Sequence, residues 1–316
     1  MNKINDISSL RFKHLALYLC LIGCMHSHLQ ADIPGAFVDI GYGARPMGMG
    51  GAYVALASDA YSVLWNPAGL PYVENWQVTT MYAKQFGVVP YALITGVHKI
   101  LPNHGMGVGV LSAGDALWRE NTFLFSYGYR PNLTWPGFQS MSIGLTFKLR
   151  TVSFGNNTDG GDDRMQGSAL GHGIDFGLRW KPGNRWVMGL LMRDIINNMT
   201  YNNETRETEY NEAVPTTLVI GTAYLPRKEL IFTLDWDKAL YSDVYDKMMA
   251  GFEIRFLNML FFRSGLSQTF NDTNNRKVNW GLGLQYFRKT FGLRFDFAYQ
   301  HYFLASTPRV STSIWF

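Results

Sequence analysis

The sequence of 316 residues has no internal run of about 18 consecutive apolar residues, the length that a membrane-spanning helix needs. Charged residues are also scarce, at 16%, whereas a soluble chain usually carries about 25%. Its two cysteines are Cys20 and Cys24, so the chain beyond them offers no disulfide, thiol nucleophile or cysteine metal site. These absences argue against a helical membrane protein, a typical soluble enzyme and a disulfide-stapled domain.

Apolar and aromatic residues are plentiful, at 47% and 15%, and there are 32 glycines. Most apolar residues stand at every second position, which is the spacing of β-strands with one apolar face. The net charge of +4 comes without a basic run, so nothing indicates a nucleic-acid partner.

The first residues are typical of an export signal. Three basic residues precede a short apolar core at 15–24, which is too short to span a bilayer. We predict a signal peptide over residues 1–31 and a mature start at Asp32. The residues 21–24 also resemble a lipobox, which would make Cys24 a lipidated N-terminus.

The rest of the chain alternates in about 14 segments, each of the length that a tilted membrane strand needs. The final strands show this best, because polar residues such as Arg294 and Asp296 alternate with phenylalanines and cannot face lipid. The apolar set is therefore expected to face the membrane. The segments are 75–85, 91–100, 105–113, 121–130, 139–154, 170–180, 186–199, 215–225, 229–239, 247–256, 259–269, 278–287, 290–304 and 308–316.

Short connections alternate with longer polar stretches, near 155–169, 200–214, 240–246 and 270–277. Outer-membrane barrels have short periplasmic turns, long external loops and an even strand count. We therefore predict an all-β fold, a transmembrane antiparallel β-barrel over 75–316. The expected location is the bacterial outer membrane, as a monomer in contact with its lipid. The terminal Phe316 is typical of chains handled by the outer-membrane assembly machinery.

Residues 32–74 differ from the barrel because glycine and alanine dominate them. They are too compact for a strand pair and too apolar for a free tail, so we predict an N-terminal plug in the barrel mouth. Ser58 is a plausible N-cap for a short helix ending near Asn66. The glycine run lacks the spacing and the strand–helix context of a nucleotide-binding loop.

This segment resembles the N-terminal signature of the PorV/PorQ family, which belongs to the FadL-like barrels. The resemblance covers residues 43–70 and includes an Asn-Pro-Ala triplet similar to that of the FadL hatch. It implies a 14-stranded barrel with a hatch. The residues matching the hatch motif are Gly48, Gly50, Gly51, Asn66, Pro67 and Ala68.

Charged residues of both signs fall on the polar faces of the predicted strands. They could form a polar translocation path, or a salt-bridge lattice that fills and stiffens the barrel, and the mixture of signs favours the lattice. The chosen lattice residues are Lys148, Arg179, Asp235, Glu253, Arg255, Arg263, Arg294 and Asp296, with Arg150, Asp175, Arg193 and Asp237 on the same faces.

Three alternating glycines, Gly105, Gly107 and Gly109, leave a bare stripe on the third strand. FadL relatives release ligand sideways through a kinked third strand. The stripe is therefore either a candidate lateral opening or room for the plug, and both interpretations stay open.

Other candidate sites carry less information. The acidic loop 156–163 does not match a known calcium-loop spacing, so we predict no metal site. The four histidines beyond the signal region are scattered and form no catalytic motif, which predicts no enzyme activity and no cofactor. Tyrosines expected in external loops form either a capture patch or the upper aromatic girdle, which we favour: Tyr201, Tyr210, Tyr241 and Tyr245.

Two functions follow as hypotheses. The first is passive, FadL-like uptake of hydrophobic small molecules such as long-chain fatty acids. The alternative, implied by the PorV/PorQ resemblance, is a component of type IX protein secretion or surface attachment that binds a secreted protein and transports no solute.

Overall fold

The computed structural model describes residues 41–155, 166–204, 207–241, 244–270 and 275–316. The predicted signal peptide, the start of the predicted plug and the acidic loop 156–163 therefore lie outside the described residues.

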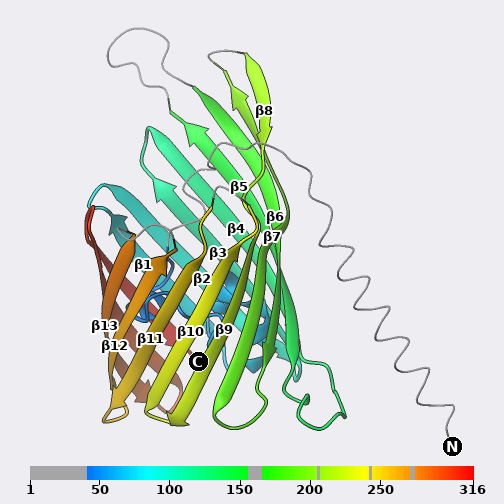
Figure 1. Cartoon of the computed structure of the whole chain (residues 1–316), viewed down its shortest axis with the longest axis vertical. Coiled ribbons are helices and arrows are strands. Elements are labelled where there is room, and N and C mark those ends of the chain that lie inside the picture. The colour runs from blue at the N-terminus through cyan, green and yellow to red at the C-terminus, as the bar shows by residue number, and fades with distance from the viewer. Residues whose placement is uncertain (1–40, 156–165, 205–206, 242–243, 271–274) are drawn as a thin grey trace, which may run out of the picture. The chain divides into compact units, whose positions relative to one another are not determined.

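Fourteen antiparallel strands form a closed barrel, as predicted (Figure 1). The ring closes because β1 pairs with both β2 and β15, while β6 pairs with β7. A further strand, β8, pairs with β7 and with no other strand among the described residues. The strands are β1 (Gln77–Gln85), β2 (Val89–Leu101), β3 (His104–Gly114), β4 (Trp118–Tyr129), β5 (Ser142–Phe154), β6 (Gly167–Trp180), β7 (Trp186–Asn203), β8 (Thr208–Glu212), β9 (Thr217–Arg227), β10 (Leu230–Ala239), β11 (Lys247–Phe256), β12 (Leu260–Thr269), β13 (Arg276–Arg288), β14 (Phe291–Tyr302) and β15 (Thr307–Trp315).

The side chains alternate as the sequence predicts. On β13, Trp280 and Leu282 are 61% and 59% exposed, whereas Asn279 between two outward neighbours is fully buried. On the adjacent strands, Arg263 and Asp296 are buried as well. A soluble barrel would place its apolar side chains inside. This inverted pattern is what a wall facing lipid requires.

The stretch 200–214 was expected to be a loop, and this expectation is wrong. There, β7 continues to Asn203 and β8 returns beside it as a hairpin. Tyr201 stacks on Tyr210, with ring centroids 5.1 Å apart, so both lie in strands instead of loops. No alternation of polar and apolar residues predicted strands here, because these strand ends are mainly polar, unlike strands that contact lipid.

The pairing of β7 is interrupted at its middle. It pairs with β9 up to Arg193 and with β8 from Met199, and Asp194 adopts a φ of 52° between them. Side chains replace the missing ladder, since Thr216 Oγ1 and Asn197 Nδ2 each donate to the Asp194 carbonyl at 2.7 Å. Beyond this break, β6, β7 and β8 extend past the neighbouring strands (Figure 1). We call residues 199–212 the projecting hairpin.

The residues before the barrel form three short helical elements, α2 (Ala44–Gly48), α3 (Ser62–Trp65) and the 3-10 helix η1 (Pro67–Tyr72). The expected N-cap at Ser58 is wrong, because α3 begins only at Ser62. The Ser58 hydroxyl donates to the Leu56 carbonyl instead, which closes a preceding turn. Within the described residues, no helix has the length and apolar character needed to cross a membrane.

Candidate functional site

Residues 41–76, called here the N-terminal segment, lie against the inner face of the barrel. Their backbone comes so close to the wall that the wall must carry glycine. A Cβ on Gly251 would lie 2.2 Å from the Met49 carbonyl oxygen, and one on Gly265 would lie 2.3 Å from the Gly50 nitrogen. Gly50 itself has a φ of 71°, which side-chain-bearing residues rarely adopt. The close contact between the N-terminal segment and the wall thus depends on glycines in both.

Asn66 organises the second half of the N-terminal segment. It is fully buried, and its Oδ1 accepts from the Ala68 amide at 3.1 Å, which caps η1 at Pro67. Its Nδ2 donates to the carbonyls of Val54 and of Leu178 on β6, at 3.0 and 3.1 Å. The Asn-Pro-Ala triplet therefore joins two parts of the segment and attaches them to the wall.

The glycine stripe on β3 lies under this region. A Cβ on Gly105 would come within 2.3 Å of the Leu70 carbonyl oxygen, and one on Gly107 within 2.6 Å of Val63. Gly109 faces other wall residues, with Thr95 at 2.9 Å. Two of the three glycines thus leave room for the N-terminal segment. Pairing of β3 with β4 is continuous, and pairing with β2 is irregular only beside their connecting turn. A lateral opening at this strand remains a prediction.

A buried ionic network joins α2 to β11, β12 and β14. Arg45 makes two 2.9 Å hydrogen bonds to the carboxylate of Glu253, which also pairs with Arg263. Arg263 continues to Asp296 at 2.7 Å, and Arg294 binds the same carboxylate at 2.9 Å. Four of the predicted lattice residues therefore meet in one network.

Arg45 connects this network to the N-terminal segment and was not among the predicted site residues. Arg45 also lies 3.1 Å from Asp59, whose carboxylate accepts from the Tyr53 hydroxyl at 2.5 Å. One signal in the sequence could have identified Arg45, namely its position inside the glycine-rich signature. That segment is predicted to be a plug inside the barrel, and a buried arginine needs a partner carboxylate.

The other predicted lattice residues are not in this network. Asp235 accepts the backbone N–H groups of Tyr53 and Val54 at 2.8 and 2.9 Å. Arg179 donates to the Ala55 carbonyl at 3.2 Å. Lys148 pairs with Asp175 and Asp194 near the break in β7, while Arg255 has no ion pair among the described residues.

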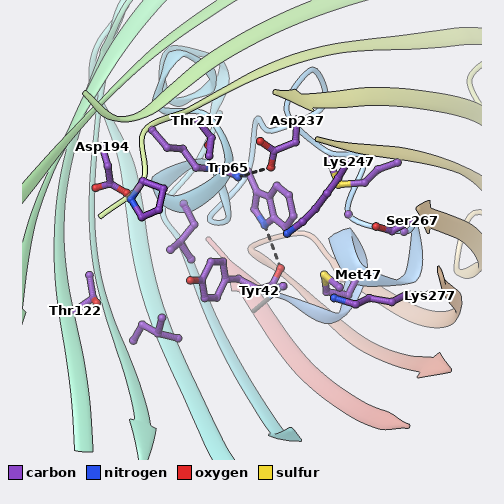
Figure 2. Close-up of a pocket in the computed structure, with 18 of the residues that line it drawn as sticks. Tyr42, Met47, Trp65, Thr122, Asp194, Thr217, Asp237, Lys247, Ser267 and Lys277 are labelled. Carbon is purple, nitrogen blue, oxygen red and sulfur yellow. Dashed lines mark hydrogen bonds and ion pairs between the residues drawn. The ribbon is translucent and has the colours of Figure 1, made fainter. Parts of the chain in front are cut away.

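A cavity of about 120 Å³ lies between the N-terminal segment and the strand ends that carry the longer connections (Figure 2). Trp65 and Tyr42 face it from the segment, and Trp65 Nε1 donates to the Tyr42 carbonyl at 3.1 Å. Burial raises the pKa of Tyr42 to about 12, so this phenol stays neutral at physiological pH.

The wall of the cavity mixes charged and apolar groups. Arg193 pairs with Asp237 at 3.2 Å on one side, and Lys247 and Lys277 project from the other. Leu111, Leu124 and Met249 supply apolar surface. Among the described residues, no group of three histidine or acidic side chains is placed to hold a metal ion.

Beyond the cavity, in the projecting part of the sheet, apolar side chains face inward and polar side chains face outward. Its inward face holds a buried apolar cluster, to which the side chains of Trp118, Phe154 and Tyr201 add further contacts. Its outward face carries exposed Ser153, Ser168 and Asn202. A polar outward face suits water instead of lipid, so this part of the sheet lies beyond the membrane. The members of the cluster are Val152, Ala169, Met199 and Val214.

Comparison with solved structures places this architecture among known barrels. The CymD monoaromatic hydrocarbon channel superposes with a TM-score of 0.62 at 15% identity, covering 88% of this chain and 97% of that one. The Pseudomonas putida toluene transporter TodX gives 0.59 at 12%, covering 87% and 97%. A Pseudomonas aeruginosa FadL homologue gives 0.58 at 11%, covering 86% and 97%.

No protein-family model matches the sequence, and no curated protein matches it. The PorV/PorQ resemblance therefore rests on the N-terminal signature alone. The chain forms a closed barrel of 14 strands that superposes on these channels over nearly their whole length. It therefore has the fold of the FadL-type hydrocarbon channels.

Proposed function

We propose that this chain is a bacterial outer-membrane channel for hydrophobic small molecules. The observation that carries the proposal is the polarity of the wall. Apolar side chains cover the outside of the barrel, and then turn to the inside where the sheet projects beyond the membrane. A hydrophobic molecule arriving from water would meet the partly buried rings of Trp118, Phe154 and Tyr201, which pack against the buried apolar cluster, before it reached the cavity at Trp65.

Residues 32–74 act in this proposal as a hatch, and the N-terminal segment contains its described part. Buried contacts hold this part to the inner face of the barrel at Leu178, Asp235 and Glu253. A solute can pass only if some of these contacts break or the segment shifts. Passage needs no nucleotide, because the solute moves down its own concentration gradient.

Long-chain fatty acids and monoaromatic hydrocarbons are the two substrate classes to test first. The named neighbours are described as monoaromatic hydrocarbon and toluene channels, which makes small aromatic molecules the closer candidates. Purified protein is reconstituted into liposomes that contain a trapped reporter and whose outer leaflet carries lipopolysaccharide, which slows the entry of hydrophobic molecules. It should raise the entry rate of toluene or of a fatty acid above that of protein-free liposomes of the same composition. Equal rates for both solutes with and without the protein would refute uptake.

The alternative is a PorV/PorQ-like role in type IX secretion, in which the barrel receives a secreted protein. The signature around Asn66 and the projecting hairpin support it. Native mass spectrometry of protein extracted gently from its own membrane separates the two functions. A bound lipophile that is lost in Asn66→Ala supports uptake, whereas a bound protein and an empty barrel support secretion.

A further inference from the structure

The strand β8 has a free edge in the part of the chain that the structure describes. It pairs with β7 over Met199–Asn203 and with no other described strand. A strand edge presents unpaired N–H and C=O groups and is a template for another strand. This edge is on the projecting hairpin, where water and not lipid surrounds it.

The hydrogen-bond pattern shows which groups face outward. The Glu204 amide donates to Gln166 on the β6 side of β7, so the even-numbered residues of β7 bond toward β6. The odd-numbered residues then bond toward β8, where their register partners are residues 208, 210 and 212. The backbone N–H and C=O groups of Glu209 and Asn211 consequently point to the free edge.

The side chains around this edge define what can pair with it. The described residues of the projecting hairpin, 199–204 and 207–212, include four glutamates and no lysine or arginine. Glu209 is exposed on the outward face, and Tyr210 is 44% exposed on the other face, stacked on Tyr201. A second copy of β8 would bring like charges together across the edge, which disfavours self-pairing.

We propose that the free edge of β8 binds an extended protein segment with alternating lysine or arginine residues, by β-strand addition. Main-chain hydrogen bonds to Glu209 and Asn211 provide the attachment, and the exposed carboxylates of Glu207 and Glu209 select basic side chains on the partner. This docking surface is independent of the cavity and of solute uptake. It would operate whether or not a molecule passes through the barrel.

The test uses the full-length protein in nanodiscs of zwitterionic lipid and a fluorescent peptide in which lysine and threonine alternate over eight residues. Fluorescence anisotropy at low salt should show at least tenfold tighter binding of this peptide than of one with glutamate in place of lysine. Methylating the backbone nitrogens of alternate residues of the peptide should weaken binding at least tenfold. This second peptide leaves the protein unchanged, so misfolding cannot explain its result.

Protein variants separate the backbone from the side chain. Asn211→Pro removes one outward N–H without removing a backbone hydrogen bond to β7, whereas Asn211→Ala keeps that N–H. Both variants lose the 2.7 Å hydrogen bond that Asn211 Oδ1 accepts from Thr200 Oγ1 on β7, so Asn211→Ala is the matched control for that loss. We expect at least a tenfold loss with proline and less than a threefold loss with alanine. Equal binding by the two variants, or by the methylated and unmethylated peptides, would overturn the proposal. So would equal binding of acidic and basic peptides, or concentration-dependent self-association through this edge.

Discussion

Both the oxygen and the nitrogen of the Asn66 side-chain amide form hydrogen bonds with backbone groups. Two of these groups are in the N-terminal segment and one is on β6. Asn66→Ala would leave the carbonyls of Val54 and Leu178 buried without this donor, at a cost of about 1–3 kcal/mol for each group left unpaired. We expect faster hydrogen exchange throughout residues 54–72 while the strands stay protected. Asn184→Ala, in an exposed turn, is the control and should change nothing. Unchanged exchange in Asn66→Ala would show that the wall holds the segment without this residue.

Glu253 is the residue on which Arg45 and Arg263 converge. Glu253→Gln retains the shape but not the charge, so both arginines would keep a buried positive charge with less compensation. Breaking a buried pair in this way costs about 3–5 kcal/mol. The expected result is a lower midpoint of thermal unfolding and faster exchange at α2. Glu229→Gln, at the exposed turn before β10, should match the wild type in both measurements, and a Glu253→Gln protein that also matched it would contradict the anchoring role.

At the scale of elements, the fit between β3 and the N-terminal segment can be tested directly. In Gly107→Leu, the new side chain would collide with Val63, since even a Cβ would come within 2.6 Å. We expect the barrel to form, because the ladder of β3 is unaffected, and the segment to be displaced. Solute entry into liposomes should therefore change.

Gly96→Leu on the paired strand β2 is the matched control, because a Cβ there has no atom within 4 Å. It should leave solute entry unaltered. If Gly107→Leu produced a folded barrel with unchanged passage, neither a lateral opening at β3 nor a hatch held by this contact could be maintained.

At the scale of the whole molecule, closure of the barrel brings the last strand beside the first. Phe316 donates its backbone N–H to the Trp76 carbonyl, while its side chain is 60% exposed. An exposed side chain contributes little to folding, so a role in delivery to the membrane should be separable from stability. Phe316→Ala is expected to reduce the amount of barrel in the outer membrane of cells without altering unfolding of the purified protein.

Phe303→Ala is the control for this experiment, because Phe303 is 61% exposed and follows β14 at the other end of the barrel. It should assemble normally. If both variants assembled equally well, or if Phe316→Ala unfolded more easily in purified form, recognition of the aromatic residue after β15 by the assembly machinery would not explain its presence.

The period-two alternation of apolar and polar residues was sufficient to predict the barrel. That signal is local, because each residue of a strand faces either lipid or the inside, and one wrong position would expose a polar group to lipid. The segment predicted at 247–256 accordingly coincides with β11. The alternation of apolar and polar residues stops where the strands leave the lipid. The polar residues of β8 were therefore predicted to be a loop.

Which inward residues meet depends on the tertiary structure. Arg45 and Glu253 are 208 positions apart, and nothing in their local sequence connects them. Their pairing depends on which strands stand beside the N-terminal segment after the ring has closed. The same holds for Gly105 and Gly107. Glycine is required at these positions because Leu70 and Val63 lie against them, and this contact is visible only in the structure. Alternation along a strand is a property of neighbouring residues, whereas contact across the barrel is a property of closure.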